Sequence, residues 1–412
     1  MIRLRPEGPG SGLRYSFHFM PIRRKQRNMA IPTLNEQAEA LRDGSATSVE
    51  LTEAALARAA DPAGEGARVF TRVYAKGARA AAQAADALRG AGLARSPIDG
   101  LPISIKDLFD VAGETTLAGS VVLRDAAPAA SHAVVVRRLI AAGAVLVGRT
   151  NMTEFAYSGL GINPHYGTPR NPWDRATGRI PGGSSSGAAV SVTDCMAAGA
   201  IGSDTGGSVR IPAALCGLAG FKPTARRVPM RGVLPLSREL DSIGPLAPTV
   251  RCCATLDAVI SGDDAPLPEP AVLPGLRLAV PTTLALDGLD AHVAATFRAT
   301  LDRLSQAGAN VDEIAVPEFR QLADINAKGG FTAAEAWVWH REWIATGADR
   351  YDPRVVSRIR RGRDISAADW LDMQTARKAW IAAVERRIAG YDALVMPTVT
   401  VVAPPIADVA AP

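Results

Sequence analysis

Apolar residues recur along this chain of 412 residues in two patterns, one with helical spacing and one of short continuous runs. The helical spacing predicts helices over Leu34–Arg42, Ser48–Ala60, Ala75–Leu93, Ala133–Ala142, Asp290–Ala307 and Ala367–Ile388. The short runs predict buried strands at Pro102–Ile105, Ala144–Val147 and Leu276–Pro281. Because helices alternate with apolar strands, the pattern predicts an α/β fold in which helices cover the faces of a sheet.

Two glycine–serine turns, joined by a helix of small residues, stand out between residues 181 and 212, which read PGGSSSGAAVSVTDCMAAGAIGSDTGGSVRIP. Glycines allow the tight turns and close backbone approach that such loops need. Successive N–H groups in these turns form a pocket for negative charge. A hydroxyl beside such a pocket is what acyl transfer requires, so the sequence predicts a serine nucleophile here.

Lys106 follows the predicted strand Pro102–Ile105 and precedes Asp107. Lysine is seldom fully buried unless it is paired. Desolvation that lowers its pKa from about 10.4 by roughly three units would make Lys106 a usable base near neutral pH. Taken alone, the residue favours a structural interpretation, in which it reaches water or pairs with Asp107.

Three segments of the chain, PISIKD, PGGSSSG and GSDTGGSVRIPA, together resemble the signature segments of the amidase signature family of serine amidohydrolases. The resemblance continues through VGRTNMTEFA, NPWD, CGLAGFKPT, DSIGPLAPTV and YDALVMPT, and it spans roughly Met29 to the end. It implies the amidase signature fold, a large, mostly parallel or mixed central β-sheet covered on both faces by α-helices.

The resemblance also implies a Ser–cis-Ser–Lys triad. By motif position, Ser208 matches the nucleophile, Ser184 matches the bridging serine with a cis peptide bond, and Lys106 matches the base. The oxyanion hole falls on the backbone N–H groups of Thr205, Gly206, Gly207 and Ser208. This chemistry needs no metal or organic cofactor. We expect none, because the four cysteines lack C-x-x-C spacing and no cluster has metal-ligand spacing.

Three functions are consistent with these motifs. The first is an amidase that hydrolyses the C–N bond of a small carboxamide, to a carboxylate and ammonia or an amine, through a seryl acyl-enzyme. The second is the glutaminase (A) subunit of an aminoacyl-tRNA amidotransferase. The third is an α/β-hydrolase-type esterase, because GSSSG also fits G-x-S-x-G. Its nucleophile would be Ser185 and its base His292 or His340, and it leaves GSDTGGS unexplained.

Charge divides the chain into two parts. Residues 1–28 hold seven basic residues against Glu7, and since the whole chain carries +5, the remainder carries −1. We interpret the basic part as a disordered extension before a start at Met29, and residues 29–412 as one amidase signature domain. The resemblance implies a further C-terminal segment after Pro412.

The near-neutral remainder predicts no nucleic-acid partner. The lack of an apolar run of about 18 residues predicts no membrane span. Four cysteines are too few for a disulfide scaffold, which favours reduced thiols and a cytoplasmic location. The sequence identifies neither the amide nor the oligomeric state, and leaves a homodimer open.

Several polar residues near the motifs raise narrower expectations. Asp194 interrupts the helix of small residues, so it needs a partner or a solvent-facing position. Asp204 and Arg210 flank the second turn and are expected to form an ion pair that orders it. Tyr157 and His165 lie on a loop between motifs, where lining a pocket and packing both fit.

Overall fold

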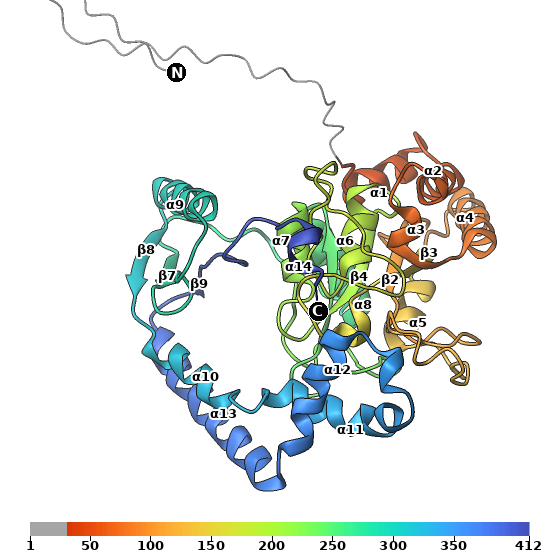
Figure 1. Cartoon of the computed structure of the whole chain (residues 1–412). Coiled ribbons are helices and arrows are strands. Elements are labelled where there is room, and N and C mark those ends of the chain that lie inside the picture. Colours follow the sequence, from red (N-terminus) through yellow and green to blue (C-terminus); the bar gives the residue numbers. More distant parts are fainter. Residues whose placement is uncertain (1–30, 412) are drawn as a thin grey trace, which may run out of the picture. The chain divides into compact units, whose positions relative to one another are not determined.

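A six-stranded mixed sheet, flanked by helices, is the larger of the two sheets in the computed structural model, which describes residues 31–411 (Figure 1). The basic extension predicted at residues 1–28 lies outside the described residues. The strands are ordered β1-β3-β2-β4-β6-β5, with β2 parallel to both β3 and β4 and the other neighbours antiparallel. Their bounds are β1 (Phe70–Val73), β2 (Pro102–Lys106), β3 (Val145–Thr150), β4 (Gly199–Asp204), β5 (Ala219–Gly220) and β6 (Ser242–Ala247).

Helices of the first two thirds of the chain pack on this sheet. They are α1 (Leu34–Asp43), α2 (Ser48–Ala60), α3 (Gly66–Val69), α4 (Ala75–Gly90), α5 (Val134–Ala141), η1 (Glu154–Ala156), α6 (Ser186–Thr193), α7 (Arg210–Cys216) and α8 (Val250–Ser261). Successive residues of a strand point to opposite faces. Ile201 and Ile243 therefore pack in the core with α1, α5 and α8, whereas Ala200 and Leu246 pack with α6 and α7. Both faces are covered, which confirms the predicted fold class.

Capping boxes mark the starts of several predicted helices. At α2, the Glu50 N–H donates to Thr47 Oγ1 (3.1 Å) and the Glu50 carboxylate accepts from the Thr47 N–H (2.8 Å). Each box supplies partners for backbone groups that a helix end leaves free. As a result, α2 matches its predicted bounds at both ends.

The later part of the chain forms a second sheet with its own helices. Its strands β7 (Arg277–Pro281), β8 (Asn310–Ile314) and β9 (Ala393–Leu394) are parallel in the order β8-β7-β9, beside α9 in Figure 1. The predicted strand Leu276–Pro281 thus exists, but it lies outside the central sheet because both its edges pair with β8 and β9. The helices are α9 (Ala291–Gln306), η2 (Pro317–Arg320), α10 (Gln321–Ile325), α11 (Gly330–Gly347), η3 (Ala348–Arg350), α12 (Pro353–Arg360), η4 (Arg361–Asp364), α13 (Ala367–Ile388) and α14 (Ile406–Val409). None of the helices within residues 31–411 has the length and apolar character needed to span a bilayer.

His340 is buried on α11, and we expect it to make stability depend on pH. Its Nδ1 lies 3.0 Å from the Tyr351 hydroxyl, and its ring packs on Phe155. Burial lowers the pKa of His340 from 6.5 to about 4. Between these values the unfolded chain binds a proton that the folded chain does not, so the free energy of unfolding falls as pH drops through this window. The free energy of unfolding, measured with urea, should fall by roughly 2 kcal/mol between about pH 7 and pH 4.5.

A matched pair of variants isolates this effect. His340→Leu should lose most of the pH-dependent fall, whereas replacing the exposed His292 with alanine should leave it intact. An equally steep fall in His340→Leu would show that other groups cause it.

Candidate active site

Lys106 ends β2 with its side chain fully buried. Its Nζ lies 2.8 Å from Ser184 Oγ and 2.9 Å from Ser203 Oγ. Asp107, by contrast, pairs with Arg149 at 2.8 Å. The structural alternative, in which Lys106 pairs with Asp107 or reaches water, is therefore wrong. Ser203 was not predicted as a site residue, although it belongs to the GSDTGGS segment and lies near the end of β4, which runs parallel beside β2.

Burial sets the protonation of Lys106. It lowers the pKa of the amine from 10.5 to about 7, while the negative charges of Asp204 and Asp241 act in the opposite direction. A large share of the amine is therefore uncharged near neutral pH and able to accept a proton.

Ser184 lies in the first glycine–serine turn, fully buried, and its peptide bond with Gly183 is cis. The turn passes very close to Gly161: a Cβ at Gly183 would lie 2.5 Å from the Gly161 nitrogen. Only glycine fits at this position without a shift of the backbone. The Thr153 N–H donates to the Ser184 carbonyl at 3.0 Å and holds the turn against the sheet.

The second turn, which links β4 to α7, carries Ser208. Asp204 accepts hydrogen bonds from the N–H groups of Gly207 (2.8 Å) and Val209 (3.1 Å), and from the Arg210 guanidinium at 2.9 and 2.8 Å. Burial opposes ionisation of Asp204, but Arg210 and the N–H groups hold its pKa below the ordinary value. The expected ion pair is confirmed, and it orders the turn. Gly207 has φ +121°, a value that favours glycine.

The backbone N–H groups of this turn differ in what they bind. The Gly207 N–H is occupied by Asp204. The N–H groups of Thr205, Gly206 and Ser208 have no acceptor among the described residues. Three of the four groups expected in an oxyanion hole are therefore free to receive a ligand oxygen.

The two turns lie side by side, because the Ser185 N–H donates to the Ser208 carbonyl at 3.2 Å. Among the described residues, however, no hydrogen bond joins the Ser184 and Ser208 hydroxyls. The structure thus brings Lys106 into direct contact with Ser184, and Ser208 into the neighbouring turn.

Ser208 borders a cavity of about 340 Å³. Tyr157, Leu236, Thr332 and Arg358 contribute to its walls, the last two from α11 and α12. The Tyr157 hydroxyl lies 3.1 Å from Thr332 Oγ1, and Arg358 Nη1 donates to the Tyr157 carbonyl at 2.7 Å. Tyr157 therefore lines the pocket. No sequence motif marked Leu236, Thr332 or Arg358, because they reach the cavity only through the tertiary fold.

Glu154 is a buried carboxylate that contacts three other segments of the chain near this wall. It accepts hydrogen bonds from Ser120 Oγ (2.7 Å) and from the N–H of Asp352 (2.7 Å), which caps α12, and it lies 2.8 Å from His165 Nε2. His165 therefore has a supporting contact here. Asp194 likewise has a partner, since Arg175 contacts it at 2.9 and 2.7 Å.

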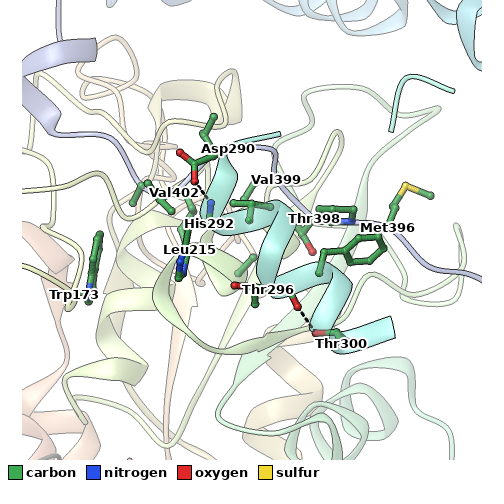
Figure 2. A pocket seen from close by; sticks show the side chains of 16 residues that line it. Trp173, Leu215, Asp290, His292, Thr296, Thr300, Met396, Thr398, Val399 and Val402 are labelled. Atoms are coloured by element: carbon green, nitrogen blue, oxygen red, sulfur yellow. Dashed lines mark hydrogen bonds between the residues drawn. The ribbon is translucent and has the colours of Figure 1, made fainter. Parts of the chain in front are cut away.

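A larger cavity, of about 960 Å³, lies elsewhere, between α9, residues 396–403 and the end of α7 (Figure 2). Trp173, Leu215, His292 and Thr296 are among its lining residues, and none of Lys106, Ser184 and Ser208 belongs to it. Its larger size does not make it the reaction site, because none of the predicted catalytic residues lines it.

The α/β-hydrolase alternative is wrong. Ser185 is fully buried and its hydroxyl lies 3.4 Å from the Ser203 carbonyl. His340 contacts Tyr351, and His292 lies in the larger cavity. Neither histidine is placed to act on Ser185.

Comparison with known proteins assigns the family. A family model described as Amidase matches residues 50–411. The chain is 39% identical to 2-amino-5-chloromuconic acid deaminase of Comamonas testosteroni, over 81% of this chain and 72% of that protein. It is 36% identical to the A subunit of the glutamyl-tRNA(Gln) amidotransferase of Chloroflexus aggregans, over 91% of this chain and 83% of that protein.

Solved structures of related enzymes support the same family. An amidase crystal structure superposes with a TM-score of 0.83 at 34% identity, covering 91% of this chain and 83% of that one. A 6-aminohexanoate cyclic dimer hydrolase superposes with a TM-score of 0.77 at 25% identity, covering 91% and 81%. The chain therefore belongs to the amidase signature family, and it is an enzyme of the amidase class that hydrolyses C–N bonds.

Proposed function

We propose that this protein hydrolyses a small carboxamide through an acyl-enzyme on Ser208, with Ser184 as proton relay and Lys106 as base. The observation that carries this proposal is the buried Lys106 amine, 2.8 Å from Ser184 Oγ, with Ser208 in the adjoining turn at a cavity. A lysine with a pKa of about 7 suits the role of base near neutral pH.

The reaction proceeds in two halves. Substrate binding turns the Ser208 hydroxyl toward Ser184. Ser208 Oγ then attacks the carbonyl carbon, its proton passes to Ser184, and the Ser184 proton passes to Lys106. The free N–H groups of Thr205, Gly206 and Ser208 stabilise the oxyanion. The relay returns a proton to the departing nitrogen as the C–N bond breaks. A water molecule then gives a proton to the same relay and attacks the ester carbonyl. The relay returns that proton to Ser208 Oγ as the ester bond breaks, which releases the carboxylic acid and restores Ser208.

The residues that line the 340 Å³ cavity favour a substrate whose acyl part carries a carboxylate. Arg358 is the one charged side chain among the described residues that line it. Its Nη1 binds the Tyr157 carbonyl, whereas Nε and Nη2 make no hydrogen bond among the described residues. A guanidinium with free N–H groups suits a carboxylate. The relative from Comamonas testosteroni is named for an acid substrate, which supports the same substrate class.

Arg358→Gln tests this substrate class. With succinamic acid as substrate, loss of a charge-assisted hydrogen bond should raise KM roughly 10- to 100-fold. With butyramide, which has no carboxylate, KM should change by less than about threefold. Ammonia release measured over a range of each substrate gives both values.

The matched control is Arg360→Gln, which removes an exposed arginine from the same helix and should affect neither substrate. Equal KM changes for both substrates in Arg358→Gln would count against carboxylate recognition. If a panel of aliphatic, aromatic and carboxylate-bearing amides gave no ammonia with the wild-type enzyme, the hydrolytic function itself would be wrong.

A second candidate function is the glutaminase component of an aminoacyl-tRNA amidotransferase. The 36% identity to a protein of that kind, over 91% of this chain, favours it. Strict preference for glutamine, together with co-purification of a partner protein, would support this candidate over a stand-alone amidase.

A further inference from the structure

Asp241 is a buried carboxylate that joins two loops of the site. It directly precedes β6, and only 7% of its surface is exposed. One carboxylate oxygen, Oδ1, accepts a hydrogen bond from the Thr205 hydroxyl. The other, Oδ2, accepts from the N–H groups of Leu236 (2.9 Å) and Ser237 (3.1 Å). A single side chain therefore ties the Thr205 turn to the loop at residues 236–237.

Both loops border the reacting hydroxyl. Thr205 begins the turn that ends at Ser208, and its N–H is one of the three without an acceptor among the described residues. Leu236 forms part of the wall of the 340 Å³ cavity that Ser208 borders. A shift of Asp241 would therefore move an oxyanion donor and a substrate wall together.

The charge of Asp241 also acts on Lys106. Two carboxylates favour the protonated amine, Asp204 and Asp241. Asp204 is balanced by the Arg210 guanidinium at 2.8 Å. Asp241 has hydrogen-bond donors but no ion-pair partner among the described residues. Lys222 donates to the Pro223 carbonyl (2.8 Å) and to Ser242 Oγ (3.5 Å) rather than to a carboxylate. Asp241 is therefore the less compensated of the two negative charges.

A purely structural role does not require this charge. Burying a carboxylate without a cationic partner is costly, and a neutral side chain could anchor a loop at lower cost. Burial holds the pKa of Asp241 above its ordinary value, and the Thr205 hydroxyl, the two N–H groups and the Lys106 charge oppose that rise by favouring the ionised form. Unpaired buried charges of this kind are concentrated at functional sites.

We propose that Asp241 is a positioning residue of the hydrolytic reaction: it fixes the Thr205 N–H and the Leu236 wall relative to Ser208. Its negative charge also favours the protonated form of Lys106. This role rests on the proposed function. The residue acts through Thr205, Leu236 and Lys106 and contacts no substrate itself.

The test follows labelling of Ser208 by a phosphonofluoridate, in which Ser208 Oγ attacks phosphorus, its proton passes through Ser184 to Lys106, and fluoride leaves. The labelling rate is measured against pH in the full-length wild-type protein and in Asp241→Asn. The variant should label at least about tenfold more slowly, because an oxyanion donor is displaced. Its pH midpoint should lie about one unit lower, because a negative charge near Lys106 is lost.

Two further variants separate the two parts of the role. Thr205→Val removes the hydroxyl contact but keeps the charge, so labelling should slow while the midpoint stays at the wild-type pH. Asp99→Asn is the matched control: it neutralises another fully buried carboxylate, one that pairs with Arg95 away from the cavity. It should change neither the labelling rate nor the midpoint.

Each outcome decides the proposal. A wild-type midpoint and rate in Asp241→Asn, or an equal midpoint shift in Asp99→Asn, would overturn it. If Asp241→Asn does not fold, an unchanged labelling rate in Thr205→Val overturns it instead. Failure of the wild-type protein to label at Ser208 would refute the proposed nucleophile, and the role of Asp241 with it. A labelled wild type with no effect of Asp241 would leave the proposed function standing.

Discussion

Ser208→Ala is expected to reduce kcat by roughly 10⁴-fold or more. The reason is that Ser208 carries the hydroxyl that lies in the turn with the free N–H groups and borders the 340 Å³ cavity. Without it, the remaining groups can polarise an amide but cannot form an ester with its acyl part. Ammonia release at saturating substrate measures the loss, and mass spectrometry should find no covalent acyl adduct.

The control for Ser208→Ala is Ser191→Ala. Ser191 is also a fully buried serine, on α6, and its Oγ lies 2.8 Å from Ser104 Oγ, away from the cavity. This change should lower stability slightly and leave kcat within about twofold. Activity near the wild-type level in Ser208→Ala would mean that a different residue attacks the amide.

Lys106→Met should make the protein more stable and almost inactive. Its activity should fall roughly 10²- to 10⁴-fold, because the proposed base is lost. The wild-type chain holds the amine uncharged at a pKa of about 7, against 10.5 for an exposed lysine, and each unit corresponds to about 1.4 kcal/mol. Methionine fills the same space with no charge to neutralise. The free energy of unfolding near pH 7 should therefore rise by about 3 kcal/mol, after allowance for two lost hydrogen bonds.

The pH dependence of this gain is a sharper test than its size. Between about pH 7 and 10.5 the unfolded lysine holds a proton that the folded one has released, so wild-type stability rises with pH in this window. The difference in free energy of unfolding between Lys106→Met and wild type, measured with urea, should therefore shrink as the pH rises through this window. Lys328→Met, at an exposed lysine on the surface, should change stability by no more than about 0.5 kcal/mol. A Lys106→Met variant less stable than wild type at every pH would show that the amine is not held uncharged.

Local signals in the sequence were sufficient to predict many of the helices and strands. The helices α2 and α13 occur at their predicted bounds, and a capping box marks the start of each. The strand β2 was marked by its short apolar run and is fully buried. The second sheet could not be predicted, because two-residue strands such as β9 carry no period of their own and depend on pairing with β7.

The candidate site, too, could be predicted only in part from the sequence. Lys106, Ser184 and Ser208 lie in contiguous motifs, so their types and spacing could be read directly. Thr332 and Arg358 lie more than a hundred residues later in helices without a motif, and only packing brings them to the cavity. The occupation of the Gly207 N–H by Asp204 also depends on side-chain geometry, which no sequence pattern records.

The walls of the cavity come from several separate stretches of the chain, which has a consequence for how this enzyme can evolve. Ser208 and its turn border the cavity on one side, whereas Thr332 and Arg358 line it from α11 and α12, and Glu154 holds the start of α12 through Asp352. Under the proposed function, we expect mutations in α11 and α12 to exchange one amide for another while bond cleavage continues. Catabolism of a new nitrogen source could begin with a few substitutions there.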